Sequence, residues 1–225
     1  SITGEGIDAF KAELLRLANE IIPKRIDTPF RMPIDSILTI KGFGTVVRGT
    51  VISGAIKIGD NIYIEPGSYK SRVRTIQSHG SNKQEGFAGE RIALNLPDIS
   101  RDKLDRGMMV VKEGFFTETR YMLVKLSYLP YNIRPLKSRT KCQLHIYSSR
   151  VNAELLLLGC EELQPGADGY ALVNLEAPVI ACYGDPFVIR GYGIYTTQGG
   201  GIVLNPSIEL LSRSEYRKDY IKSIE

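Results

Sequence analysis

The fold is decided by the run GFGTVVRGTVISGAIKIGD at residues 42–60. Apolar and polar residues alternate through residues 45–52, which is typical of a strand with one buried face. Gly59-Asp60 marks a tight turn before the next apolar run. The stretch ERIALNL at residues 90–96 repeats the alternation. No helical period long enough for a parallel crossover lies between these runs, so we expect antiparallel pairing.

Strands of this kind fill most of the chain in two sets. The first set is predicted over residues 37–40, 45–52, 61–64, 71–76, 91–96 and 108–111. The second set is predicted over residues 121–126, 140–147, 151–158, 169–175, 187–190 and 201–204. Many short strands joined by glycine and proline turns favour closed barrels. The predicted fold class is therefore all-β, with two consecutive antiparallel β-barrels.

One amphipathic helix precedes the barrels. Ile7, Phe10, Leu14, Leu17 and Ile21 recur at helical spacing, and Pro23 ends the run. Nothing nearby offers this apolar face a partner, so we expect its neighbour in a domain upstream of residue 1. The expected division of the chain is a helix and linker at 1–27, a first barrel at 28–114, a second barrel at 115–210 and a further linker at 211–225.

Composition sets outer limits on the function. The 225 residues are 43% hydrophobic and 24% charged, as in an ordinary globular protein. A net charge of +4 permits a polyanionic partner but does not by itself identify one. The sequence lacks both a membrane-length apolar run and a secretion signal. We therefore expect a soluble, cytoplasmic protein with no membrane partner.

The sequence contains no recognisable catalytic or metal-binding motif. It lacks the phosphate-binding loop G-x-x-x-x-G-K-[ST], the nucleophile elbow G-x-S-x-G and the zinc motif H-E-x-x-H. Cys142, Cys160 and Cys182 stand in or beside apolar runs and are predicted to be buried free thiols. We expect His79 and His145, the two histidines, to bind no metal. The chain itself is expected to be neither an enzyme nor a cofactor carrier.

The same runs resemble a known family. GFGTVVRGTV (42–51), SGAIKIGD (53–60) and AGERIALN (88–95) look like the second domain of translational GTPases. The segment TGEGID (3–8), with the helix after it, resembles the last helix of the GTPase domain in those proteins. FRMPID (30–35), IKGFG (40–44) and GGGIVLNP (199–206) are similar to bacterial selenocysteine-specific elongation factors in particular.

The resemblance implies a site for the aminoacyl end of selenocysteinyl-tRNA on the first barrel. The positions that match its charged side chains are Asp35 and Arg91. Asp35 would either hold the guanidinium of Arg91 or accept the ammonium group of the amino acid. The family often has an arginine directly after this aspartate, where this chain has Ser36. Arg31 or His79 is a candidate to compensate for it.

Other residues are candidate contacts to the tRNA itself. Glu90 matches an acidic position that lies near the terminal adenosine in related factors. Arg72 and Arg74 alternate on one predicted strand and would meet phosphates or remain in water. The same two alternatives hold for the basic loop of Lys137, Arg139 and Lys141.

The function that the resemblance implies is GTP-dependent delivery of selenocysteinyl-tRNA to the ribosome. GTP and Mg²⁺ would bind an upstream GTPase domain, and a C-terminal winged-helix part would read a messenger hairpin. One alternative is the same two domains of a general elongation or initiation GTPase. Another is a scaffold that docks on the ribosome or a protein without a ligand pocket.

Overall fold

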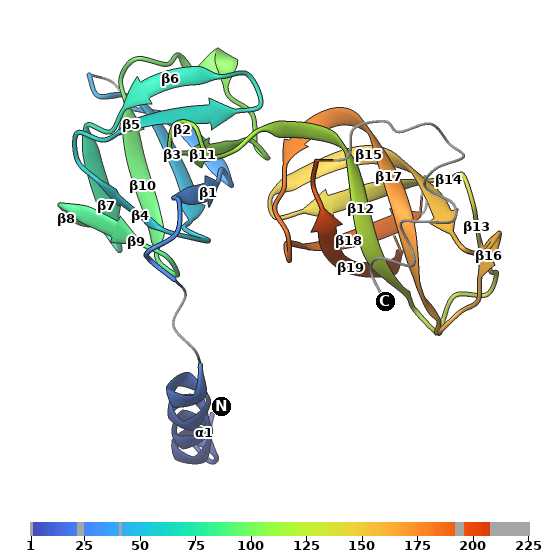
Figure 1. Cartoon of the computed structure of the whole chain (residues 1–225). Helices are drawn as coiled ribbons and strands as arrows, with labels where there is room; N and C mark the ends of the chain where they lie inside the picture. The colour runs from blue at the N-terminus through green and yellow to red at the C-terminus, as the bar shows by residue number, and fades with distance from the viewer. Residues whose placement is uncertain (1, 22–24, 41, 192–195, 208–225) are drawn as a thin grey trace.

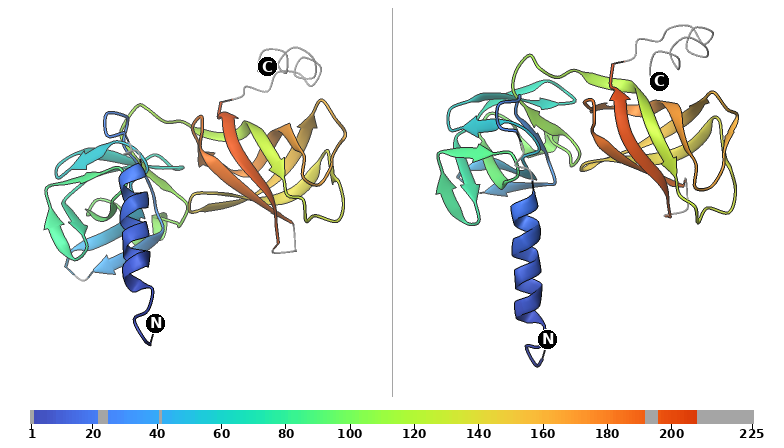
Figure 2. Two further views of the ribbon diagram at one scale, coloured as in Figure 1. Left: turned by 90° about the horizontal axis from the view of Figure 1, so that it is seen from below. Right: turned by 60° about the horizontal axis from the view of Figure 1, so that its bottom comes forward.

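The computed structural model describes residues 2–21, 25–40, 42–191 and 196–207. Its only α-helix within these ranges is α1 (Ile7–Glu20), which Figures 1 and 2 show standing away from two β domains. No residue of α1 is buried, and Phe10 and Leu14 on its apolar face are exposed. The predicted helix is confirmed, and its apolar face meets no partner within the described part of the chain.

The first barrel is built from short strands around one core. They are β1 (Arg31–Pro33), β2 (Ser36–Ile40), β3 (Gly44–Thr50), β4 (Ala55–Lys57), β5 (Asn61–Glu65), β6 (Tyr69–Arg72), β7 (Thr75–Ser78), β8 (Ser81–Lys83), β9 (Glu85–Phe87), β10 (Arg91–Leu96) and β11 (Met109–Val111), with a short 3₁₀ helix η1 (Arg101–Lys103) before β11.

Two antiparallel sheets form the wall of this barrel. One has the order β1-β11-β5-β6 and the other β2-β3-β10-β7-β8, while β4 and β9 pair as a separate ribbon. Both sheets cover a common core that includes Phe30, Val47, Ile64 and Leu94. We had expected one closed sheet in this barrel. The hydrogen-bond ladder is instead divided between two sheets.

The predicted strand at residues 71–76 is wrong in one respect. It is two strands, because β6 ends at Arg72 in one sheet and β7 begins at Thr75 in the other. Val73 lies at the corner, where its backbone exchanges hydrogen bonds with the turn at Gly59 and Asp60. Val73 is buried, so the apolar alternation continues through the corner and conceals it in the sequence.

The second barrel is a single closed sheet. Its strands are β12 (Glu118–Tyr128), β14 (Thr140–Ile146), β15 (Ser149–Leu158), β17 (Asp168–Ile180), β18 (Pro186–Gly191) and β19 (Thr197–Asn205), with a ribbon of β13 (Leu136–Lys137) and β16 (Glu162–Leu163). The barrel order is β12-β17-β15-β14-β18-β19, and β19 pairs back with β12. All six strands predicted for this region are confirmed.

Glycines allow β19 to fit between its neighbours. A Cβ on Gly201 would lie 1.8 Å from the carbonyl oxygen of Lys125, and one on Gly200 would lie 2.6 Å from that of Phe187. The glycine run 199–201 therefore serves the close approach of three backbones.

The two barrels meet through a buried polar contact and a small apolar cluster. Arg31 of β1 binds the carboxylate of Asp185 in the second barrel with distances of 2.7 and 2.9 Å. Beside this pair, Met109 and Val111 of β11 pack against Ile180 of β17. Figure 1 shows these segments at the facing ends of the two barrels.

Candidate functional site

The candidate site lies on the outer face of the sheet that contains β2, β3 and β10. Arg48 on β3 lies directly opposite Ser36 on β2 and Ala93 on β10. Arg91 lies opposite Thr50, one pleat further along the same face. Directly opposite residues in a sheet share a face, so this register brings the side chains of Ser36, Arg48 and Arg91 together.

Asp35 and Arg91 form an ion pair at the edge of this face. Nη2 of Arg91 lies 2.8 and 3.0 Å from the two carboxylate oxygens of Asp35. The side chain of Arg91 is 53% exposed and that of Asp35 is 33% exposed, so the pair lies at the surface. Nη1 and Nε of Arg91 have no hydrogen-bond acceptor among the described residues, which leaves donors free for a ligand.

Arg48 is a third charged residue at this place, and the sequence had not singled it out. Its side chain is exposed, and no acidic side chain within the described ranges pairs with it. Its carbonyl oxygen accepts a 2.9 Å hydrogen bond from the backbone N–H of Asp35. The available signal was its position in the alternation of β3, where Val47 faces the core and Arg48 faces outward.

His79 lies next to the strand of Arg91. It follows β7 with a positive φ of 50°, and its side chain is exposed. The hydroxyl of Ser78 donates to the carbonyl oxygen of Arg91 and lies 3.1 Å from Nδ1 of His79. The imidazole is thus linked to the backbone of Arg91 through one hydroxyl group.

Glu90 is already paired inside the first barrel. One of its carboxylate oxygens binds Nζ of Lys83, and both side chains are about one-third exposed. Its other oxygen lies 3.4 Å from the backbone nitrogen of Phe87. Because this contact is long, the second oxygen can accept a further hydrogen bond.

Arg31 lies away from the Asp35–Arg91 pair. Asp185 takes both of its terminal nitrogens, and Nε lies 3.3 Å from the hydroxyl of Ser53. Burial lowers the pKa of the Arg31 guanidinium, but the hydrogen bond and the charge of Asp185, with smaller electrostatic effects of Cys182 and Tyr147, together leave the pKa above its ordinary value. The structure therefore gives Arg31 a role at the contact between the barrels.

The basic residues expected near the tRNA backbone occupy two separate regions. Arg72 is exposed, and its Nε donates to the carbonyl oxygen of Gly59 at 2.9 Å, while Arg74 is exposed at the corner after β6. In the second barrel, Lys137 lies 3.5 Å from Glu162, and Lys141 faces Glu154 across the strands. Figures 1 and 2 show the ribbon of β13 and β16 at the end of the second barrel that is remote from the first.

Arg139 completes this second group of basic residues. It has a positive φ of 66°, and its backbone N–H donates to the carbonyl oxygen of Leu155. The predicted basic loop is thus a tight turn between β13 and β14, and two of its three charges, those of Lys137 and Lys141, lie beside glutamates.

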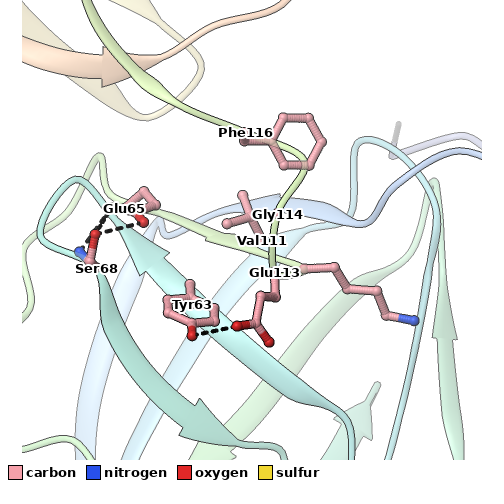
Figure 3. Close-up of a pocket in the computed structure, with 8 residues that line it drawn as sticks. Tyr63, Glu65, Ser68, Val111, Glu113, Gly114 and Phe116 are labelled. Carbon is pink, nitrogen blue, oxygen red and sulfur yellow. Dashed lines mark hydrogen bonds between the residues drawn. The ribbon is translucent and has the colours of Figure 1, made fainter.

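A shallow hollow of about 250 Å³ lies elsewhere on the first barrel, near the start of the second. Figure 3 shows its lining side chains, among which Tyr63 bonds to Glu113 and Ser68 to Glu65. Its wall comes from β5 and the end of β11, which belong to the other sheet, and from the segment that follows β11. Because these polar groups bind one another, the hollow presents fewer free hydrogen-bonding groups to a ligand than the face that carries Arg91.

The cysteines differ from one another in exposure. Cys142 is buried as predicted, Cys182 is partly buried, and Cys160 is exposed, which corrects the expectation for that residue. Cys160 lies two residues beyond the end of β15, so the apolar run of that strand ends before the thiol. Within the described part of the chain, no three His, Cys, Asp or Glu side chains gather as metal ligands. The only α-helix there is too short and too polar to cross a membrane.

Two family models match the two barrels in turn. Residues 44–111 match the model described as elongation factor Tu domain 2. Residues 124–209 match the model described as the β-barrel domain of the selenocysteine-specific elongation factor. A barrel of the first kind followed by a closed six-stranded barrel defines the chain as the two-barrel module of a translation elongation factor.

Individual relatives narrow this class. The selenocysteine-specific elongation factor of Desulfomicrobium baculatum is 34% identical over 204 residues, which are 91% of this chain and 32% of that protein. The one from Haemophilus influenzae is 30% identical over 227 residues, covering 99% of this chain and 35% of that protein. The chain therefore spans about a third of the length of these curated relatives.

Solved structures agree with this comparison. A crystal structure of a bacterial selenocysteine-specific elongation factor matches with a TM-score of 0.82 and 28% identity, over all of this chain and 36% of that one. An apo elongation factor of Methanococcus maripaludis shares the fold, with a TM-score of 0.81 over 95% of this chain and 50% of that one. The chain belongs with the selenocysteine-specific elongation factors and corresponds to their two β-barrel domains.

Proposed function

We propose that this module holds the aminoacyl end of selenocysteinyl-tRNA on the outer face of β2, β3 and β10, as part of a factor that delivers this tRNA to the ribosome. The observation that carries the proposal is the pairing of Asp35 with Arg91 at a place where two further donors of the guanidinium are free. The relatives with the same two domains are named for selenocysteine.

The chemistry of the cargo suits a guanidinium. A selenol is more acidic than a thiol or a hydroxyl, so the amino acid presents a selenolate anion at neutral pH. Arginine stays protonated under these conditions and can donate parallel hydrogen bonds to an anion. The seryl precursor carries a neutral hydroxyl and leaves the cation without its partner. Such a missing partner costs about 2–5 kcal/mol when the site excludes water.

Exposure determines when this selectivity can operate. Arg91 is 53% exposed in the structure, and exposed ion pairs contribute only about 0–1 kcal/mol because water screens them. We therefore infer that discrimination requires a second surface that covers Arg91 and removes water from it. A GTP-loaded GTPase domain, which closes on the tRNA end and opens after hydrolysis, would supply this surface.

The remaining contacts are assigned on the same geometry. His79 lies beside the strand of Arg91 and is proposed to border the cargo. The oxygen of Glu90 that does not bind Lys83 is proposed to accept a hydrogen bond from the amino group of the terminal adenine. Arg72, Arg74 and the turn of Lys137, Arg139 and Lys141 are proposed contacts for phosphates. The messenger hairpin would be read outside these two barrels.

The test uses the full-length protein in its GTP state. Arg91→Ala should lower the ratio of affinities for selenocysteinyl-tRNA and seryl-tRNA by roughly 30-fold or more, the equivalent of about 2 kcal/mol. The matched control is Arg74→Ala, which removes an exposed arginine of the same barrel and should change both affinities equally. An unchanged ratio in Arg91→Ala would remove Arg91 from cargo selection.

The exposed setting of the site also favours one alternative, a docking surface for the ribosome or a protein. In that case Arg91→Ala would weaken ribosome binding, while both aminoacyl-tRNAs would bind the variant as they bind the original protein. Measuring ribosome binding with the same variants separates the two functions.

A further inference from the structure

We infer that Arg48 supplies the net positive charge of the cargo site and is a second specificity-determining residue beside Arg91, an inference that rests on the proposed function. Arg48 would donate to the selenolate from β3, while Arg91 donates from β10. The inference is based on the register of three strands and on the charges at their outer face.

The register places Arg48 at the centre of the face. It is the residue of β3 that lies opposite both Ser36 and Ala93. Arg91 is its diagonal neighbour, and diagonal neighbours in a sheet have backbones about 7–8 Å apart, within reach of long side chains. One small anionic group can therefore contact both guanidinium groups at once.

The neighbours of Arg48 leave room for such a group. Ser36 and Ala93 have small side chains, and they flank Arg48 on both sides of its strand. The next residue beyond Ala93 is Gln77 on β7, which is engaged with Asn82 through a 3.0 Å hydrogen bond. The face thus forms a row in which one long cationic side chain stands between two short ones.

The charges around the site make Arg48 necessary for an anion. Asp35 neutralises Arg91 through both of its oxygens, and Lys83 neutralises Glu90 at the start of the same strand. A neutral pair attracts an added anion weakly, because the attraction of the cation is opposed by the repulsion of the carboxylate. Arg48 has no acidic partner within the described ranges, so it leaves the face with one net positive charge.

Asp35 connects the two arginines structurally. Its backbone N–H donates to the carbonyl oxygen of Arg48, and its carboxylate accepts from Arg91. The aspartate therefore holds the guanidinium of Arg91 next to the strand of Arg48. In this arrangement Asp35 is a positioning residue, and the two arginines are the groups that contact the cargo.

The experiment measures binding of selenocysteinyl-tRNA and seryl-tRNA to the full-length protein in its GTP state. Arg48→Ala should lower the ratio of the two affinities roughly tenfold, the effect of one charge-assisted hydrogen bond. Adding Ser36→Arg to this variant places a guanidinium on the directly opposite position and should restore at least half of the loss on a logarithmic scale. Arg150→Ala, on the second barrel, removes an equal charge from an exposed position and should leave the ratio unchanged.

Each outcome has a defined meaning. If Arg91→Ala lowers the ratio and Arg48→Ala does not, the inference is overturned and the proposed function stands. If neither variant changes the ratio, the proposed function itself fails. If Arg48→Ala lowers both affinities equally, or if Ser36→Arg gives no recovery, Arg48 is not a specificity residue. Thermal unfolding of each variant confirms that the barrel is intact.

Discussion

Arg31 and Arg91 carry the same charge, but the structure gives them different neighbours. Arg31 is 9% exposed and bound to a buried carboxylate, whereas Arg91 keeps two donors free at the surface. The partner of Arg31 is Asp185, which lies 154 residues away in the sequence. A local sequence pattern cannot reveal such a pairing, and for this reason Arg31 was a reasonable candidate for the cargo site until its partner was known.

The three cysteines should differ in reactivity because they differ in burial. Burial raises the pKa of the Cys142 thiol to about 12, and burial also raises that of Cys182. Because the thiolate is the reactive form, N-ethylmaleimide at pH 8 should modify exposed Cys160 first and Cys142 only after unfolding. Mass spectrometry of the timed reaction measures the order. Modification of Cys142 as fast as Cys160 in the folded protein would contradict the assigned burial.

The sequence predicted the kind of chemistry at the candidate site better than it predicted which residues make up the site. Asp35 and Arg91 were expected to act together, and the structure brings them within 2.8 Å. Arg48 was not expected because an arginine in a strand is usually a solvated surface residue. The role that we propose for it depends on the register between β2, β3 and β10, and this register is a property of the folded sheet.

At the scale of single elements, β19 shows why three glycines occur in succession. The strand lies between β12 and β18, and each glycine of 199–201 has a carbonyl oxygen of a neighbouring strand within 2.6 Å of the place where its Cβ would be. No side chain fits there without moving a backbone. The glycine run is therefore a packing requirement of the closed barrel.

Gly201→Ala tests this requirement. The added methyl group would meet the carbonyl of Lys125, so we expect the free energy of unfolding to fall by about 3 kcal/mol, the upper range for overpacking. Urea unfolding followed by circular dichroism measures the change. Ile202→Ala, on the exposed side of the same strand, is the control and should cost less than about 1 kcal/mol. Equal effects of the two substitutions would contradict the packing role.

The elements themselves were largely predictable, because alternation of apolar and polar residues over five or more positions is a strong signal. The strand over residues 91–96 was predicted with its correct limits. Short strands such as β4 and β9 were missed, since three residues are too few to show a period. The corner at Val73 was missed because a buried valine continues the alternation across it.

At the scale of the whole molecule, one buried ion pair fixes the contact between the barrels. The carboxylate of Asp185 accepts from Arg31, from the hydroxyl of Tyr147 at 2.7 Å and from the backbone of Cys182 at 2.8 Å. Burial raises the pKa of Tyr147, and its bond with Asp185 raises it further. Four groups from both barrels thus meet in one hydrogen-bonded network.

Removing one member of this network should be costly. Asp185→Ala leaves the guanidinium of Arg31 buried without an acidic partner, so we expect a loss of about 3–5 kcal/mol in the free energy of unfolding. The double variant Arg31→Met with Asp185→Ala should lose less, because no unpaired charge remains. Denaturation in urea measures both. A double variant as unstable as the sum of the single variants would show that the two residues act independently.

We propose that a fixed positive charge on the first barrel selects an anionic side chain on the tRNA. The most direct measurement uses the same tRNA carrying cysteine through a non-hydrolysable amide link, with binding to the GTP-bound full-length protein recorded from pH 7 to pH 9. An ordinary thiol has a pKa of about 8.5, and arginines keep their charge over this range.

Affinity for the cysteinyl form should therefore rise across this range toward that of the selenocysteinyl form, while affinity for the seryl form stays level. A cysteinyl affinity that does not change with pH would contradict the claim, because a thiolate would then bind no better than a neutral thiol.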